Sequence, residues 1–397
     1  MSDPITINGR EYTAPSQRTA VVCTDGLDPR YLEDAFDRRL TPRLRELAES
    51  GTFAVGDSQL PSFTNPNNLS IVTGAPASVH GIPGNHYLAP DGREVQLVDP
   101  DALRARSIHA ALAAAGTSVL AVTTKEKLRR LLAAGGVPAV SAERADEQGV
   151  CGIERIDRLV RRPKPGIYDW DCSHYALELA LELGDLLDVE LLYVSLTDFV
   201  QHSAGPGEEL SDRYLRRLDE LVGEYLDRGW RLGLVADHGM NAKGSRSAPT
   251  VRYLGDVLTE AGLPQVRVVL PITDPYIAHH ASLGSAAWVH VDGVEQEEVI
   301  GVLAEVEGVE EVLTRAEAAA GLEVPEDRIG DLVVLADGAT ALGGRESEHD
   351  LSQLHGALRS HGGRHEQRVP ILLSERVELP SQVRNRDVHH LLLGAAR

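Results

Sequence analysis

Cysteine is scarce in this sequence, with three residues, Cys23, Cys151 and Cys172, spread widely through 397 positions. An odd number of distant thiols argues against a disulfide framework and against a thiolate metal site, and it suits a reducing compartment. No window approaches the ~18 apolar residues of a membrane span. The N-terminal segment also lacks the basic stretch and apolar stretch of a secretory signal. We therefore expect a cytoplasmic protein with no membrane span.

Positive charge is also in short supply, because 39 lysines and arginines face 60 aspartates and glutamates, giving a formal net charge of −21. This balance argues against binding to nucleic acid through a basic face. The overall field would also repel an anionic substrate. If the substrate is a small anion, local cations must overcome that field, either as bound metal ions or as a few well-placed lysines and arginines.

Apolar residues make up 42% of the chain, which is enough for one large core or for a core with an insertion. Short apolar strands alternate with helical patterns over most of the sequence, so we expect an α/β fold. Residues 268–345 differ, because short strands there accompany an acidic helix. We expect this stretch to be a small inserted α+β cap, and residues 1–267 and 346–397 to form the core.

Three of the apolar strands end in residues that bind metals. The strand that runs into VADHGM stops at Asp237 and His238. Ligands bind at the carboxyl ends of strands in parallel α/β sheets, and a carboxylate beside an imidazole suits a metal ion. Taken alone, this stretch is explained equally well as a strand that enters a polar turn. However, a second strand ends at Asp25, and a third ends at Asp198 with His202 one helical turn further on.

Three other segments carry polar residues at positions that suit chemistry. Thr64 lies at or just before a helix N-terminus, where backbone N–H groups attract phosphate, although an ordinary N-cap is the alternative. Lys125 and Lys127 stand near the start of another helix, where basic residues are disfavoured. A solvated helix face is the alternative for this pair. His361 opens a His-Gly-Gly turn before a strand.

Together these segments supply three carboxylates, three imidazoles and one hydroxyl, from Asp25, Asp198, Asp237, His202, His238, His361 and Thr64. Two zinc ions about 3.5–4 Å apart would use such a set. Oxygen and nitrogen ligands without thiolate suit a catalytic zinc site with open coordination positions. Manganese and iron accept the same ligand types, so the residues alone leave the choice of metal open.

The order of the motifs CTDG, SFTNPNNLSIVTG, SLTDFVQH, VADHGM and SHGG resembles the alkaline phosphatase superfamily, in its nucleotide pyrophosphatase/phosphodiesterase branch. The resemblance covers nearly the whole chain. It implies an alkaline-phosphatase-like central sheet, mostly parallel, with helices on both faces. It also implies two Zn²⁺ per chain. Because zinc lowers the pKa of a bound hydroxyl, we take Thr64 as the nucleophile as a hypothesis. The implied ligands are Asp25, Thr64, Asp237 and His238 for one ion, and Asp198, His202 and His361 for the other.

Within this branch, the segments HGIPGN, TKEKLR, DPYIAHH and RSHGGRHEQRVP are similar to those of the phosphonoacetate hydrolases. That similarity implies hydrolysis of the P–C bond of phosphonoacetate to acetate and phosphate. It also implies that Asn85, Lys125 and Lys127 contact the small anionic phosphonate. A zinc phosphodiesterase or nucleotide pyrophosphatase with the same metal ligands is the alternative. A metal-binding protein without catalysis is a third interpretation, and the oligomeric state is open, a homodimer included.

Several further histidines compete for roles in the same site. We prefer His361 to His365 as a metal ligand, because the resemblance places the ligand in the His-Gly-Gly turn. His86 and the pair His279 and His280 are expected to be structural, or to support the site without contacting the metal ions.

Overall fold

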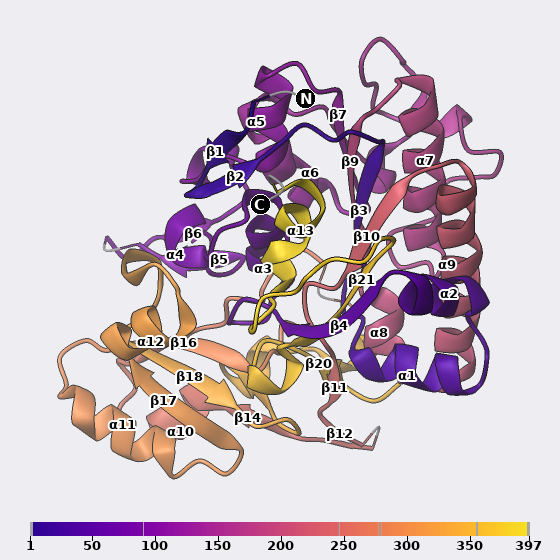
Figure 1. The fold of residues 1–397 in the computed structure, drawn as a ribbon. Coiled ribbons are helices and arrows are strands. Elements are labelled where there is room, and N and C mark those ends of the chain that lie inside the picture. Colours follow the sequence, from indigo (N-terminus) through magenta and orange to yellow (C-terminus); the bar gives the residue numbers. More distant parts are fainter. Residues whose placement is uncertain are drawn as a thin grey trace.

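A seven-stranded sheet forms the centre of the protein in the computed structural model, which describes residues 3–89, 91–245, 247–276, 278, 280–354 and 356–394 (Figure 1). In sheet order, the strands are β4 (Thr52–Asp57), β21 (Arg368–Leu373), β10 (Arg231–Val235), β3 (Thr19–Cys23), β9 (Leu191–Ser195), β7 (Val119–Thr123) and β8 (Ala139–Ser141). All pairs from β10 to β8 are parallel, whereas β21 pairs antiparallel with both of its neighbours. The expected α/β fold with a mostly parallel sheet is confirmed.

Helices cover both faces of this sheet, as the continuous apolar runs of its strands require. In β3, for example, Ala20 and Val22 pack into one hydrophobic core, while Val21 and Cys23 pack into the other. One face carries α1 (Pro29–Asp37), α2 (Pro42–Ser50), α7 (Cys172–Leu186) and α9 (Glu209–Asp227). The other face carries α3 (Thr64–Thr73), α5 (Ile108–Ala114), α6 (Glu126–Leu132) and α13 (Val388–Leu393). Figure 1 shows these two groups on opposite sides of the strands.

A second, antiparallel sheet of four strands lies at the lower left of Figure 1, in orange. Its strands, in sheet order, are β15 (Arg267–Val269), β16 (Ala286–His290), β18 (Leu332–Ala336) and β17 (Val309–Thr314). They pack with α10 (Leu254–Glu260), α11 (Gln296–Ala304) and α12 (Arg315–Leu322). The same hydrophobic cluster contains Phe63, which directly precedes Thr64. The second sheet therefore contacts the start of α3, while the division of the chain at residues 268 and 345 stays a prediction.

Short elements complete the fold. They are the pairs β1 (Ile5–Ile7) with β2 (Arg10–Tyr12), β5 (His86–Leu88) with β6 (Glu94–Gln96), β11 (Asn241–Ala242) with β20 (Arg359–Ser360), β12 (Gly244–Ser245) with β13 (Ala248–Pro249), and β14 (Val251–Tyr253) with β19 (Ala341–Gly343), and the helices α4 (Ala77–His80) and α8 (Phe199–Ser203). Within the described ranges, each helix is either too short or too polar to cross a lipid bilayer.

Two glycines allow the candidate ligand segments to approach closely. Gly26 follows Asp25 with φ of 70°, and a Cβ there would lie 3.1 Å from Asp198 Cβ. Gly362 follows His361 with φ of 122°, and a Cβ there would lie 2.5 Å from Phe63 Cε1. Both positions combine a left-handed backbone with crowding that only glycine tolerates. Backbone conformation and crowding therefore explain why the CTDG and SHGG motifs have glycine at these two positions.

Candidate metal centre

Four neighbouring parallel strands end at one edge of the central sheet, and a predicted site residue follows each of them. Asp25 follows β3, Asp198 follows β9, Asp237 follows β10 and Lys125 follows β7. Parallel strands place their carboxyl ends at the same edge, so the sheet topology gathers these four side chains. All four residues are buried.

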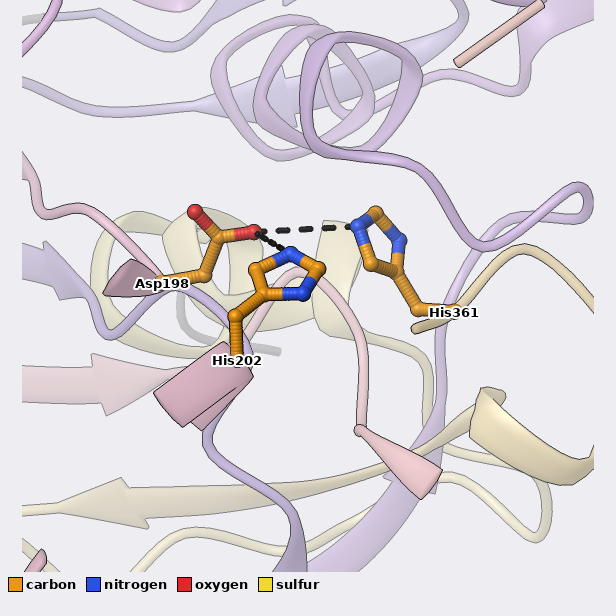
Figure 2. A group of neighbouring side chains, drawn as sticks. All are labelled: Asp198, His202 and His361. Carbon is orange, nitrogen blue, oxygen red and sulfur yellow. Dashed lines mark hydrogen bonds and ion pairs between the residues drawn. The ribbon is translucent and has the colours of Figure 1, made fainter. Parts of the chain in front are cut away.

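Asp198, His202 and His361 form a first group of ligand atoms, shown in Figure 2. Asp198 directly precedes α8, and His202 lies on that helix one turn later. His202 Nε2 lies 3.0 Å from Asp198 Oδ2, and His361 Nε2 lies 3.7 Å from the same oxygen. One ligand atom from each of the three residues lies within 4.8 Å of the others, which suits a single metal ion.

Asp25, Asp198 and His238 form a second group that meets the same criterion. His238 Nε2 lies 3.2 Å from Asp25 Oδ1. Thr64 Oγ1 completes this side of the site, at 3.2 Å from His238 Nε2 and 3.5 Å from Asp25 Oδ1. The rings of His238 and His361 stack with their centroids 3.6 Å apart. The two groups are therefore adjacent, and they share Asp198.

Each of the three histidines has its second ring nitrogen bonded to a main-chain carbonyl. The bonds run from His202 Nδ1 to Arg359 O (2.6 Å), from His238 Nδ1 to Gly239 O (2.9 Å) and from His361 Nδ1 to Ser62 O (2.8 Å). A carbonyl can only accept, so these contacts assign a proton to Nδ1, and in the neutral ring the lone pair of Nε2 faces the cluster. Metal-binding histidines are oriented in this way. The donor set thus fits metal ions.

Asp237 has both carboxylate oxygens engaged by N–H donors. Gly26 N and His238 N donate to Oδ1, at 3.1 and 3.0 Å, and Asn68 Nδ2 donates to Oδ2 at 3.2 Å. Tyr193 in turn donates its hydroxyl to Asn68 Oδ1 at 2.8 Å. Asp237 Oδ2 lies 3.8 Å from His238 Nε2, and Asp237 belongs to neither group of ligand atoms. Its role as a ligand stays a prediction.

The site concentrates negative charge away from water. Burial raises the pKa of Asp237 well above its usual value, and the neighbouring Asp25 carboxylate adds to the rise. Burial alone would lower the pKa of His238, but the Asp237 and Asp25 carboxylates outweigh it and raise the pKa to about 9. Burial lowers the pKa of His361 well below its usual value, with His238 adding to the effect. Divalent cations would neutralise this excess of carboxylate charge.

Thr64 is the first residue of α3, and Phe63 occupies the N-cap position. The Thr64 hydroxyl makes no capping hydrogen bond with the helix, so the N-cap interpretation of Thr64 is wrong. Its Oγ1 points instead to His238 and Asp25. The positive end of the α3 dipole and its free N–H groups lie at the same place, where an anion is stabilised.

Lys125 and Lys127 are only 7% and 8% exposed, so the interpretation of a solvated helix face is wrong. Lys125 is the N-cap residue of α6. Its Nζ lies 3.0 Å from Asp198 Oδ1 and 3.5 Å from Asp25 Oδ2. Lys127 Nζ is also buried, and it has no hydrogen-bond partner among the described residues. Burial lowers the pKa of Lys127 to about 8.

Asn85 lies between the start of α3 and the segment that follows β15. Asn65 Nδ2, from the residue after Thr64, donates to Asn85 Oδ1 at 2.7 Å. Asn85 Nδ2 donates to Ile272 O at 2.7 Å, and it lies 3.4 Å from Asp274 Oδ2. The structure therefore brings Asn85 close to Thr64, while its contact with substrate stays a prediction.

The remaining histidines differ in how close they lie to the two groups of ligand atoms and in how far they are buried. His365 is 43% exposed at its side chain and lies 2.9 Å from Glu310 Oε2, away from both groups of ligand atoms. His280 is buried, and its ring centroid lies 5.5 Å from that of His202. His86 is buried at the start of β5, and burial lowers its pKa. His279 lies outside the described residues. The preference for His361 over His365 agrees with this geometry.

The sequence from residue 19 to residue 364 matches the type I phosphodiesterase/nucleotide pyrophosphatase family. The chain belongs to this family. The family resemblance expected from the order of the motifs is thereby confirmed, and the protein is an enzyme of the phosphodiesterase/nucleotide pyrophosphatase superfamily.

Solved structures extend this comparison beyond the family motifs. Phosphonoacetate hydrolase from Sinorhizobium meliloti 1021 in complex with phosphonoacetate is 39% identical, with a TM-score of 0.93 and 99% of each chain covered. A structure of the same protein in complex with phosphonoformate matches equally well. Murine ectonucleotide pyrophosphatase/phosphodiesterase 5 in complex with AMP is 18% identical, with a TM-score of 0.66 and 96% of each chain covered. This second protein shares the fold of the phosphodiesterase family.

Some residues around this candidate metal centre were not predicted from the sequence. Asn68 follows Thr64 by one helical turn, so the helical spacing alone could have placed it beside the site. Asp274 lies in the quoted DPYIAHH segment, but nothing in that segment reveals its contact with Asn85. Tyr276 lies in the same segment, but its bond with Glu143, 133 positions earlier, has no signal in the sequence, and Glu143 itself belongs to no quoted motif.

Proposed function

We propose that this member of the family hydrolyses the P–C bond of phosphonoacetate to acetate and phosphate, with Thr64 as nucleophile and two zinc ions as cofactors. The observation that carries the proposal is the pair of buried lysines at the start of α6, of which Lys125 contacts the candidate metal ligands and Lys127 has no hydrogen-bond partner among the described residues. A carboxylate-bearing phosphonate needs cations beyond those around its phosphoryl group. The 39% identical structure that holds phosphonoacetate supports the same substrate.

The proposed metal ligands take the first group of donors unchanged, and for the second ion they combine Asp25 and His238 with Thr64 and Asp237. One ion would be held by Asp198, His202 and His361, and the other by Asp25, Thr64, Asp237 and His238. Zinc bound there would lower the pKa of the Thr64 hydroxyl and polarise the phosphoryl group. The orientation of the three Nε2 atoms toward the cluster and the buried carboxylates support this assignment.

Thr64 Oγ1 is the group that would attack phosphorus. It is oriented by the start of α3 and faces the cluster at 3.2 Å from His238 Nε2. The free N–H groups of the first turn of α3 would stabilise the phosphoryl oxygens as charge develops on them. Asn85, fixed by Asn65 and by Ile272 O, would contact the phosphonate beside this turn.

The leaving group sets the main chemical difficulty. As the Thr64 O–P bond forms, the C–P bond breaks and its electron pair moves to the methylene carbon. The acetate fragment can carry that pair only as an enolate, so negative charge grows on its carboxylate oxygens. The ammonium groups of Lys125 and Lys127 would offset this charge. The carbon takes up one proton to give acetate, which balances the proton that the Thr64 hydroxyl gives up on attack. Water then cleaves the phosphothreonine, which releases phosphate and regenerates the hydroxyl.

A substrate comparison tests the proposal. The zinc-loaded protein should show a far higher kcat/KM for phosphonoacetate than for bis(p-nitrophenyl) phosphate. A chelator should abolish the activity, and added zinc should restore it. Strong cleavage of the diester with no phosphate released from phosphonoacetate would contradict the proposal.

That contrary result would support a phosphodiesterase or nucleotide pyrophosphatase, which the description of the matched family favours as the second candidate. The candidate metal ligands would be the same for both activities. Only the roles proposed for Lys125 and Lys127 would have to change.

A further inference from the structure

The segment from Asp274 to Tyr276, which follows β15, is bonded to the start of α3 at one end. Asp274 Oδ1 accepts a hydrogen bond from Tyr276 N at 2.7 Å, and Asp274 Oδ2 lies 3.4 Å from Asn85 Nδ2. Asn85 accepts in turn from Asn65, the residue after Thr64. The Asp274 side chain is only 14% exposed. This end of the segment therefore lies against the phosphoryl side of the proposed site.

The other end of the segment is bonded to the start of α6. The Tyr276 hydroxyl donates to Glu143 Oε2 at 2.6 Å. The same oxygen accepts the backbone N–H of Glu126 at 2.7 Å, and Glu126 lies between Lys125 and Lys127. Tyr276 itself is buried. One carboxylate oxygen thus joins the segment after β15 to the helix end that carries both lysines.

The two lysines lie beside this bridged segment. Burial acts to lower the pKa of both lysines, and carboxylates oppose it, mainly Asp198 and Asp25 at Lys125, with Asp274 contributing at both. Lys125 already contacts Asp198, whereas Lys127 Nζ has no hydrogen-bond partner in the described part of the chain. A buried ammonium without a partner is costly, so its donors are available to an anion.

We propose that Glu143 and Tyr276 form a specificity-determining latch, which fixes the segment 274–276 and the start of α6 so that Lys125 and Lys127 are held for the carboxylate of the substrate. The inference rests on the function proposed above. Glu143 and Tyr276 are positioning residues, because they act through the lysines and through Asp274.

The side chain of Glu143 is bonded to Glu126 and Tyr276, at the end of the site that we assign to the substrate carboxylate. The phosphoryl end is assigned to Thr64 and the candidate metal ligands, which lie at the start of α3 and around the strand ends of the central sheet. The carboxylate end depends on the start of α6, whose first N–H is bonded to Glu143. Small displacements of positioning groups cost about 10²-fold in rate when they misplace a reacting group. Loosening the latch should therefore reduce turnover of phosphonoacetate selectively.

A double-mutant cycle on the zinc-loaded full chain tests this inference. The variants are Tyr276→Phe, Glu143→Ala and the double variant, and each is assayed on phosphonoacetate and on p-nitrophenyl phosphate. Tyr253→Phe is the matched control, because Tyr253 lies on β14, apart from the latch. Zinc content and the midpoint of thermal unfolding show that each variant is folded and loaded. Glu143→Gln keeps an acceptor oxygen and should restore most of the activity lost in Glu143→Ala.

We expect Tyr276→Phe and Glu143→Ala each to lower kcat/KM for phosphonoacetate about tenfold, the scale of a lost hydrogen bond to a charged group, with less than about a twofold change on the ester. The double variant should lose no more than the larger single loss, since both changes break the same bond. Equal losses on both substrates, or additive losses in the double variant, would overturn the latch. If the wild-type protein releases no phosphate from phosphonoacetate, the proposed function itself fails, and the latch falls with it.

Discussion

Lys127 places an ammonium group in a buried position where, among the described residues, no atom accepts a hydrogen bond from it. Burial is the main reason that its pKa is lowered to about 8, and the nearby charge of Lys125 contributes, while Asp274 acts in the opposite direction. Binding of a carboxylate requires the charged amine, which predominates only below this pKa. The ionisation of this one residue therefore links the structure to a measurable pH dependence.

We predict that kcat/KM for phosphonoacetate falls as the pH rises through about 8, because Lys127 then loses its proton. This ratio reports ionisations of the free enzyme. In Lys127→Arg the positive charge persists, so the fall near that pH should disappear even if the absolute rate is lower. The measurement is a pH profile of both proteins on phosphonoacetate. An unchanged alkaline fall in the arginine variant would contradict the role of Lys127.

Asn68 is hydrogen-bonded to two residues of the candidate site, Asp237 and Thr64. Its amide donates to Asp237 Oδ2 at 3.2 Å and to Thr64 O at 2.9 Å, and it accepts from Tyr193 at 2.8 Å. One side chain thus orients a proposed metal ligand and the proposed nucleophile together. Groups that hold metal ligands in place matter for affinity almost as much as the ligands do.

We predict that Asn68→Ala lowers zinc affinity about 10- to 100-fold, because Asp237 loses an orienting hydrogen bond. Competition with a chelator of known affinity measures this change. Tyr193→Phe is the graded control, since it removes the bond that orients Asn68 but leaves Asn68 and its bond to Asp237 in place, and its effect should be smaller. Unchanged zinc affinity in Asn68→Ala would show that Asp237 is not held for a metal ion.

At the scale of elements, a buried ion pair joins the segments that carry His238 and His361. Lys243 Nζ lies 2.8 Å from Glu366 Oε1, and both side chains are 0% exposed. Glu366 also accepts from Asn241 Nδ2 at 2.6 Å, and its carbonyl accepts from Gly239 N at 2.7 Å. The turn after β10 and the turn after β20 are therefore fixed to each other.

We predict that Lys243→Met lowers the free energy of unfolding by about 3–5 kcal/mol, because it leaves the buried Glu366 carboxylate without its counter-charge. Urea denaturation of the zinc-free proteins measures this loss. The double variant Lys243→Met with Glu366→Gln removes both charges and should recover part of it. A double variant less stable than Lys243→Met alone would argue against an uncompensated charge as the cause.

The elements also show what could be predicted from the sequence. Asp25, Asp198 and Asp237 were identified because each follows an apolar strand, and parallel strands end at one edge of a sheet. Lys243 and Glu366 were not identified, because they are 123 positions apart and neither belongs to a repeating pattern. The local sequence predicts strand ends and turns, whereas pairings between distant segments depend on packing that no local pattern records.

At the scale of the whole molecule, the net charge of −21 opposes the approach of a small anion. Local positive charge at the candidate site can offset this repulsion. The structure buries Lys125 and Lys127 beside a cluster of carboxylates and imidazoles that suits metal ions. The likeness to phosphonoacetate hydrolase from Sinorhizobium meliloti 1021 extends over 99% of both chains, so it includes the second sheet as well as the central one.

The central claim is that this centre breaks a P–C bond, and ³¹P NMR of the zinc-loaded protein with phosphonoacetate tests it most directly. The account predicts that the phosphonate resonance is replaced by that of inorganic phosphate, with one acetate formed for each phosphate. It also predicts that the conversion stops in Thr64→Ala. A phosphonate resonance that persists unchanged while the same preparation cleaves bis(p-nitrophenyl) phosphate would contradict the claim.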